Sequence, residues 1–184
     1  VRCHGNMNRH EAEEEMLSLL YGMNLKDGKK LLDSYAFEMS GGICQRVSIA
    51  LSMVLRPKLL LADEPTSALD VRVQAQVVKE LMETRKNFGT SILIVSHNMG
   101  VIAHMADNIA VMYAGIILEY GKKIHILSHP AHPYTQNLIQ AIPKLGAQAP
   151  RGIQTYTHDR KSNACPITCN CKRSRPQCQE QLPD

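Results

Sequence analysis

Asp63 and Glu64 are adjacent carboxylates whose types and position could support metal binding or water activation. They follow a short, wholly apolar run, residues 59–62, which is typical of a strand buried on both faces. At the carboxyl end of such a strand, Asp63 can hold Mg²⁺ directly or through water. Glu64 can act as a general base toward an attacking water. The alternative is that both are solvated acids in a turn before Pro65.

A second candidate is the segment Ser40-Gly41-Gly42, which precedes a stretch with helical spacing. Glycines at a helix start expose backbone N–H groups, and the helix dipole adds positive potential, so the segment suits a phosphate. Gln45 lies in the same first turns and could contribute a further polar contact. The simpler alternative is that Ser40 only caps the helix.

His97 is the third candidate, because it follows a second apolar run, Ser91–Val95. An imidazole at this point can hydrogen-bond a phosphate or position a water molecule. Taken alone, a histidine in a loop is more often a surface residue. The three candidates gain weight together, because the ends of predicted strands and the starts of helices are where α/β proteins place their sites.

The elements that must position these residues can be read from hydrophobic spacing. Pro57 ends one helix, and Gly89 caps another. Continuous apolar strands alternating with helices predict an α/β layered domain. We expect helices at 9–21, 43–54, Val71–Phe88 and 100–106, strands at 59–62 and Ser91–Val95, and a hairpin formed by 109–113 and 116–120.

Composition narrows the classes of function. The 184 residues carry a formal net charge of +4, a surplus too small to predict a nucleic-acid partner. No apolar stretch reaches the ~20 residues that a membrane-spanning helix needs. Residues 1–15 are polar and charged, so no secretory signal is evident.

Four of the six cysteines crowd near the C-terminus. Without a secretory signal, clustered thiols favour metal ligation over disulfides. Zinc ligation and reduced thiols in a flexible tail are two alternatives for this cluster. The four residues are Cys165, Cys169, Cys171 and Cys178.

The fixed order of these motifs resembles the nucleotide-binding subunits of ABC transporters. Ser40-Gly41-Gly42 resembles the family's signature motif, and residues 60–63 resemble Walker B. Glu64 then matches the catalytic glutamate, the segment ending at Asp70 the D-loop, and His97 the switch histidine. The resemblance implies a layered P-loop NTPase-like fold of the ABC ATPase type.

The subfamily is indicated by three further segments. Residues 35–39 before the signature, His132-Pro133-Tyr134-Thr135 and the cysteine tail are similar to ATP-binding subunits of oligopeptide, dipeptide and nickel importers. The resemblance implies ATP hydrolysis that drives peptide import, with nickel import as the alternative. Some relatives carry an iron–sulfur cluster in the tail, so a [4Fe-4S] cluster on Cys165, Cys169, Cys171 and Cys178 is a further expectation.

The resemblance also implies cofactors and partners. Two such domains sandwich two ATP molecules with Mg²⁺, so Ser40 and the two glycines would serve the nucleotide of the partner subunit. Glu64 and His97 would serve their own site. The implied partners are a second ATP-binding subunit, identical or paralogous, membrane-spanning permease subunits and, indirectly, an extracytoplasmic solute-binding protein. The implied location is the cytoplasmic face of the membrane, as a peripheral subunit.

One motif of the family is missing, since no G-x-x-x-x-G-K-[ST] occurs in the sequence. We therefore expect the C-terminal portion of a subunit, inactive as an ATPase by itself. The expected division is a nucleotide-binding part at 1–143, a linker at 144–163 and a cysteine-rich extension at 164–184. A non-catalytic metal or redox sensor on the same scaffold is the alternative from another functional class.

Overall fold

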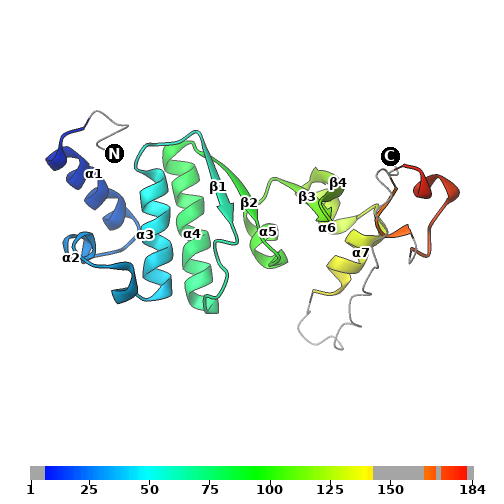
Figure 1. The fold of residues 1–184 in the computed structure, drawn as a ribbon, viewed down its shortest axis with the longest axis horizontal. Coiled ribbons are helices and arrows are strands. Elements are labelled where there is room, and N and C mark those ends of the chain that lie inside the picture. The colour runs from blue at the N-terminus through cyan, green and yellow to red at the C-terminus, as the bar shows by residue number, and fades with distance from the viewer. Residues whose placement is uncertain (1–6, 143–163, 169–170, 182–184) are drawn as a thin grey trace. The chain divides into compact units, whose positions relative to one another are not determined.

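The computed structural model describes residues 7–142, 164–168 and 171–181. The chain divides into two compact units, Val1–Asn98 and Met99–Asp184, and each is described by itself (Figure 1). The linker expected at 144–163 lies outside the described residues, as does Cys169. Within the described ranges, no helix is both long enough and apolar enough to cross a membrane.

The first unit is a small parallel sheet with helices packed beside it. Its two strands, β1 (Leu59–Asp63) and β2 (Ser91–Val95), pair in parallel with Asp63 opposite Val95. In Figure 1, α3 and α4 lie on one side of these strands. The helices are α1 (Arg9–Gly22), α2 (Gly28–Leu32), the 3₁₀ turn η1 (Ala36–Glu38), α3 (Gly41–Met53) and α4 (Val71–Phe88).

Helix α4 is the crossover between the two strands, and its ends are fixed by local chemistry. The Asp70 side chain accepts hydrogen bonds from the backbone N–H groups of Arg72 and Val73, both at 3.0 Å. At the other end, Gly89 adopts φ +64°, the left-handed conformation that glycine reaches without a steric cost. The helix expected over Val71–Phe88 and the strand expected over Ser91–Val95 are therefore confirmed with those bounds.

The prediction that the two strands are buried on both faces is wrong. Leu60 is buried, but Leu61 on the opposite face is 67% exposed, and its register partner Leu93 is 58% exposed. Leu59 and Val95 are exposed with them. The physical reason is that the helices pack against one face of this two-stranded sheet and leave the other uncovered.

The core of the first unit forms where α1 packs against α3 and where α3 meets α4. Helix α1 begins with a reciprocal capping box between Asn8 and Glu11. The helix expected at 43–54 is confirmed as α3, Gly41–Met53, and the chain turns at Arg56 with φ +47° before Pro57. The main buried side chains are Met16, Leu19, Leu20, Ile49, Ala50, Met53, Val77 and Leu81.

The second unit is built on an antiparallel hairpin, β3 (Asn108–Tyr113) and β4 (Ile116–Lys122). Its turn, Ala114-Gly115, has positive φ at both residues, which matches the right-handed twist of a hairpin. The expected hairpin is confirmed, with a bulge between Val111 and Met112. The other elements are α5 (Met99–Met105), α6 (Lys123–Ser128), α7 (Pro133–Gln140) and the 3₁₀ turn η3 (Pro176–Gln179).

Candidate functional site

Glu64 and His97 come together because they follow two paired strands. The register of β1 and β2 ends with Asp63 opposite Val95, and the Glu64 N–H donates to the Val95 carbonyl at 2.9 Å. The carboxylate oxygen Oε1 of Glu64 then accepts the backbone N–H of His97 at 3.1 Å and lies 2.8 Å from its ring Nδ1. One oxygen thus fixes both the backbone and the ring of His97.

The second carboxylate oxygen of Glu64, Oε2, is buried and has no hydrogen-bond partner among the described residues. The backbone of Glu64 also has φ +45°, a left-handed conformation that is uncommon for residues other than glycine. An unsatisfied buried acceptor and a strained backbone at the same residue are typical of functional sites. The oxygen therefore lacks a donor, and a water molecule reaches it only when the surrounding side chains move.

The hydrogen bond to Glu64 sets the chemistry of the His97 ring. Because Oε1 is an acceptor, Nδ1 carries the proton, which leaves Nε2 free to act. The side chain of His97 is 79% exposed, so Nε2 is accessible from solvent. A neutral ring offers Nε2 as an acceptor for a water proton, and a protonated ring offers it as a donor to an anion.

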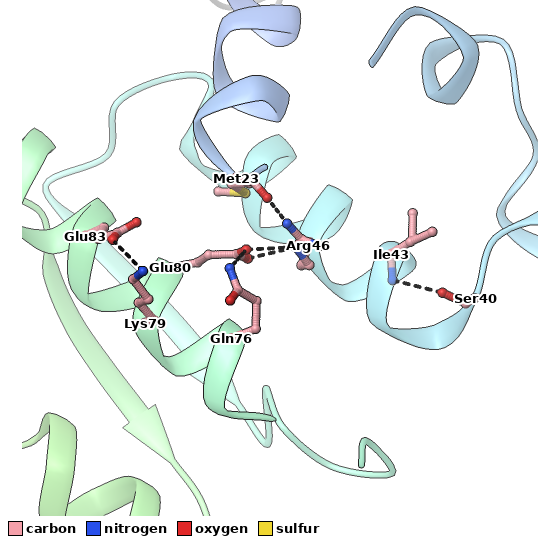
Figure 2. Close-up of polar contacts among 8 residues, drawn as sticks. All are labelled: Met23, Ser40, Ile43, Arg46, Gln76, Lys79, Glu80 and Glu83. Carbon is pink, nitrogen blue, oxygen red and sulfur yellow. Dashed lines mark hydrogen bonds and ion pairs between the residues drawn. The ribbon is translucent and has the colours of Figure 1, made fainter. Parts of the chain in front are cut away.

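The Ser40-Gly41-Gly42 segment forms the start of α3. Ser40 Oγ accepts the Ile43 N–H at 3.5 Å, which makes it a long cap (Figure 2). A Cβ atom added to Gly42 would lie 2.7 Å from Cγ1 of Val73, so only glycine fits at this point against α4. Gly41 is exposed, whereas Gly42 and Ile43 are half-buried.

The remaining predicted residues have simpler surroundings. Asp63 is exposed at the end of β1, and Gln45 is half-buried on α3. Asp70 caps α4, so its Oδ1 is already used by two backbone donors. Among the described residues, no hydrogen bond or ion pair is found that joins Ser40 to Glu64 or His97. The structure thus forms two groups, one at the strand ends and one at the start of α3.

Gln74 links the segment before α4 to the residue after His97, and it was missed in the sequence. Its Nε2 donates to the Leu69 carbonyl at 3.0 Å, and its Oε1 accepts from Asn98 Nδ2 at 3.3 Å. Both contacts depend on how α4 packs, so the sequence offered no signal for them.

A buried ion pair between Arg46 and Glu80 was also missed. Arg46 Nε lies 2.8 Å from Glu80 Oε1, and Gln76 Nε2 donates to the same oxygen at 2.8 Å (Figure 2). Burial raises the pKa of the Glu80 carboxyl, while the hydrogen bond from Gln76 and the charge of Arg46 oppose that shift. The available signal was a charged residue between the apolar positions Val77 and Leu81.

In the second unit, the C-terminal segment contacts the start of α7 through Cys165. Its Sγ lies 3.8 Å from Nε2 of His132, and both residues are buried. Burial lowers the pKa of His132, and the nearby carboxylate of Glu119 opposes that shift. Because His132 Nδ1 accepts the Tyr134 N–H at 3.2 Å, Nε2 carries the proton and donates toward the sulfur.

The metal site expected on the cysteine tail is not formed by the described residues. Among residues 7–142, 164–168 and 171–181, no three His, Cys, Asp or Glu side chains group as metal ligands. Cys171 and Cys178 are half-buried thiols, and Cys165 faces His132 instead. Within the described residues, these three cysteines are therefore not arranged as the ligands of an iron–sulfur cluster.

Two family models and several known proteins are similar to this chain. Residues 2–67 match the family model of the ABC transporter, and residues 118–178 match that of the oligopeptide/dipeptide transporter C-terminal region. The solved structure of MJ1267, an ATP-binding cassette of an ABC transporter, aligns with a TM-score of 0.54 at 25% identity, covering 64% of this chain and 46% of that one.

Three relatives match almost the whole chain. It is 38% identical to the oligopeptide transport ATP-binding protein OppD of Salmonella typhimurium, covering 100% of the chain and 56% of the relative. It is 37% identical to the probable D,D-dipeptide transport ATP-binding protein DdpD of Escherichia coli K12, covering 97% of the chain and 56% of the relative. It is 35% identical to the dipeptide transport ATP-binding protein DppD of the same organism, covering 100% of the chain and 57% of the relative. The chain spans little more than half the length of these relatives. On the two family models and this identity along the chain, it belongs to the oligopeptide/dipeptide group of ABC transporter ATP-binding proteins.

Proposed function

We propose that the chain provides the catalytic glutamate and the signature segment of an ATP-binding subunit that drives peptide import. The observation that carries the proposal is the Glu64–His97 pair at the ends of two paired strands, with Glu64 Oε2 buried and unpartnered. The relatives are named for oligopeptides and dipeptides, which favours peptide over nickel as the imported solute.

Glu64 acts as the general base in this proposal. Its Oε2 accepts a proton from the attacking water, while Oε1 holds His97 so that Nε2 is directed away from the carboxylate. His97 then orients the water or donates to the γ-phosphate, according to its protonation. Both residues act by position and electrostatics, which provide most of the catalysis in phosphoryl transfer.

Asp63 is the residue placed to hold Mg²⁺, directly or through water. It is exposed at the strand end next to Glu64, and carboxylate oxygens are the ligands that Mg²⁺ prefers. When bound, the ion neutralises charge on the phosphate oxygens of ATP. Exposure of Asp63 and the free Oε2 of Glu64 are both compatible with such a site.

The signature segment serves a different nucleotide in this proposal. Ser40 and the backbone of Gly41 and Gly42 donate to the γ-phosphate of ATP held by the partner subunit, with Gln45 and Asp70 nearby. Two observations support this division. Gly41 in the first turn of α3 is exposed, and no phosphate-loop motif occurs in the 184 residues. ATP then binds the closed pair of subunits better than the open pair and shifts the population between them.

The proposed assembly contains a second ATP-binding subunit and membrane-spanning permease subunits, and it works indirectly with an extracytoplasmic solute-binding protein. The chain lies at the cytoplasmic face of the membrane in this assembly. Residues 1–143 form part of the nucleotide-binding domain, 144–163 a linker and 164–184 a cysteine-rich extension. We refer below to this complex, with the subunit that contains the chain, as the assembled transporter.

The test is Glu64→Gln in the assembled transporter in proteoliposomes. Loss of the general base lowers ATP turnover by about a hundredfold or more, while ATP binding persists. Glu83→Gln is the matched control, because Glu83 is an exposed carboxylate on α4. Equal turnover in Glu64→Gln and the unchanged protein would disprove the proposed role, and import of nickel without import of peptide would disprove the proposed solute.

A further inference from the structure

We infer that Arg46 is a positioning residue that holds the signature segment of α3 in place through its buried ion pair with Glu80 of α4. The inference rests on the proposed function, because it assigns to Arg46 the orientation of the backbone groups at Gly41 and Gly42 that contact the nucleotide. The role is distinct from catalysis, since Arg46 acts through the helix on which it lies.

Arg46 connects three helices. Its Nε lies 2.8 Å from Oε1 and 3.1 Å from Oε2 of Glu80, and a second nitrogen donates to the carbonyl of Met23, the residue that caps the C-terminus of α1. Figure 2 shows the guanidinium between Met23 and Glu80. A planar guanidinium with donors in fixed directions specifies orientation better than a single point charge does.

The partner of Arg46 is itself held in one position. The side chain of Glu80 is 1% exposed, and Gln76 Nε2 donates to Oε1 from one turn earlier on α4 at 2.8 Å. Arg46 is 15% exposed, so neither charge has much contact with water. A buried ion pair adds little net stability compared with well-packed apolar side chains. Its contribution here is therefore the fixed geometry between α3 and α4.

A second contact between the same helices fixes the orientation of α3 relative to α4. Gly42 meets Val73 near the start of both helices, and Arg46 meets Glu80 one turn further along α3 and about two turns further along α4. Two separated contacts prevent α3 from sliding or rotating on α4. The cap from Ser40 Oγ to the Ile43 N–H is long at 3.5 Å, so it contributes less to the position of the first turn.

Helix α4 also carries a matched control pair. Lys79 and Glu83 form an ion pair at 3.8 Å, but their side chains are 66% and 48% exposed (Figure 2). Both residues lie on α4, so the pair has the same charges as Arg46 and Glu80 without the link to a second helix. Exposed pairs of this kind have little effect on structure.

The experiment compares three variants in two measurements. The variants are Glu80→Gln, the apolar double variant Arg46→Met/Glu80→Met, and the control Lys79→Gln/Glu83→Gln. The first measurement is amide hydrogen exchange of the 184-residue chain, and the second is the ATP dependence of turnover in the assembled transporter. The double variant keeps the volume of the buried pair, so it separates loss of positioning from failure to fold.

We expect Glu80→Gln and the double variant to raise KM for ATP by about tenfold. This is the change in affinity that corresponds to the loss of one hydrogen bond to a charged group. The turnover number kcat changes much less, because the signature contacts the phosphates before and during reaction alike. Amide exchange accelerates at Ile43 and Cys44, whose N–H groups donate to Ser40, and stays unchanged in β1 and β2. The control variant changes neither quantity.

Three results would overturn the inference. These are an unchanged KM in the double variant, accelerated exchange spread equally over β1, β2 and α3, and the same rise in KM in the control. Failure of the proposed function gives a different result. In that case Glu64→Gln leaves ATP turnover of the assembled transporter unchanged. The two failures are therefore distinguishable.

Discussion

One oxygen atom of Glu64 makes both of its contacts with His97. Oε1 of the carboxylate lies 3.1 Å from the backbone nitrogen and 2.8 Å from the ring Nδ1 of His97. The second oxygen of Glu64 is buried and has no partner among the described residues. In the proposed function the two oxygens have different roles, because Oε1 orients the imidazole and Oε2 accepts the proton of the reacting water.

This division predicts the behaviour of His97 variants in the assembled transporter. His97→Ala removes the donor to Glu64 Oε1 and lowers ATP turnover by about a hundredfold, the effect of a lost acid–base group. His97→Asn lowers ATP turnover less than His97→Ala does, because the Asn amide places a donor near the position of Nδ1. ATP turnover at saturating ATP is the measurement, and His104→Ala, an exposed histidine of α5, is the control. Full turnover in His97→Ala would contradict the assignment.

The close approach of Gly42 to Val73 predicts a difference between two neighbouring glycines. Gly42→Ala places a Cβ 2.7 Å from Val73 Cγ1 and destabilises the chain by about 1–3 kcal/mol, the usual cost of overpacking. Gly41→Ala is tolerated, because its Cβ would meet Leu69 at 3.9 Å, an ordinary contact. Urea unfolding of the 184-residue chain measures both changes.

A double variant checks the cause of the Gly42 effect. Val73→Ala removes the methyl group that the new Cβ would meet, so Gly42→Ala costs less in a Val73→Ala background than in the unchanged chain. Equal costs in both backgrounds would show that the destabilisation arises elsewhere.

The α3–α4 relationship also shows what the sequence was able to predict. The bounds of α4 followed from its hydrophobic spacing and from Gly89, which are local signals, and Asp70 caps its other end in the structure. The pair Arg46–Glu80 spans 34 positions and exists only because two helices pack side by side, so no local pattern indicated it. The short helices α2, α6 and α7 were not predicted either, and α2 and α6 have no side-chain cap that could have indicated them.

The burial of the strands could not be predicted for a different physical reason. A continuous apolar run indicates that both faces of a strand suit burial, but it does not say which face this chain itself covers. Leu60 and Leu61 are chemically the same and adjacent, yet one is 8% and the other 67% exposed. The proximity of Glu64 and His97, in contrast, follows from two parallel strands ending at the same edge.

The buried imidazole of His132 predicts a pH dependence of stability. Burial lowers its pKa in the folded chain, so the unfolded chain binds a proton more readily. The stability from the neutral ring is therefore fully present above the unfolded pKa of ~6.5 and is lost as pH falls through the folded pKa. Urea unfolding of the chain and of His132→Ala at several pH values measures this, and the advantage of the unchanged chain shrinks with acidification. An advantage that grows in acid would mean that the folded state binds the proton more tightly.

The two faces of the β1–β2 sheet lead to the sharpest prediction for stability. Leu60→Ala removes buried methyl groups and leaves a cavity, at a cost of about 2–5 kcal/mol in the free energy of unfolding. Leu61→Ala removes the same atoms from the uncovered face and changes stability by less than about 0.5 kcal/mol. Leu93→Ala behaves like Leu61→Ala, because Leu93 is its register partner. Urea unfolding of the 184-residue chain measures all three, and a loss in Leu61→Ala as large as that in Leu60→Ala would show that the face is covered in solution.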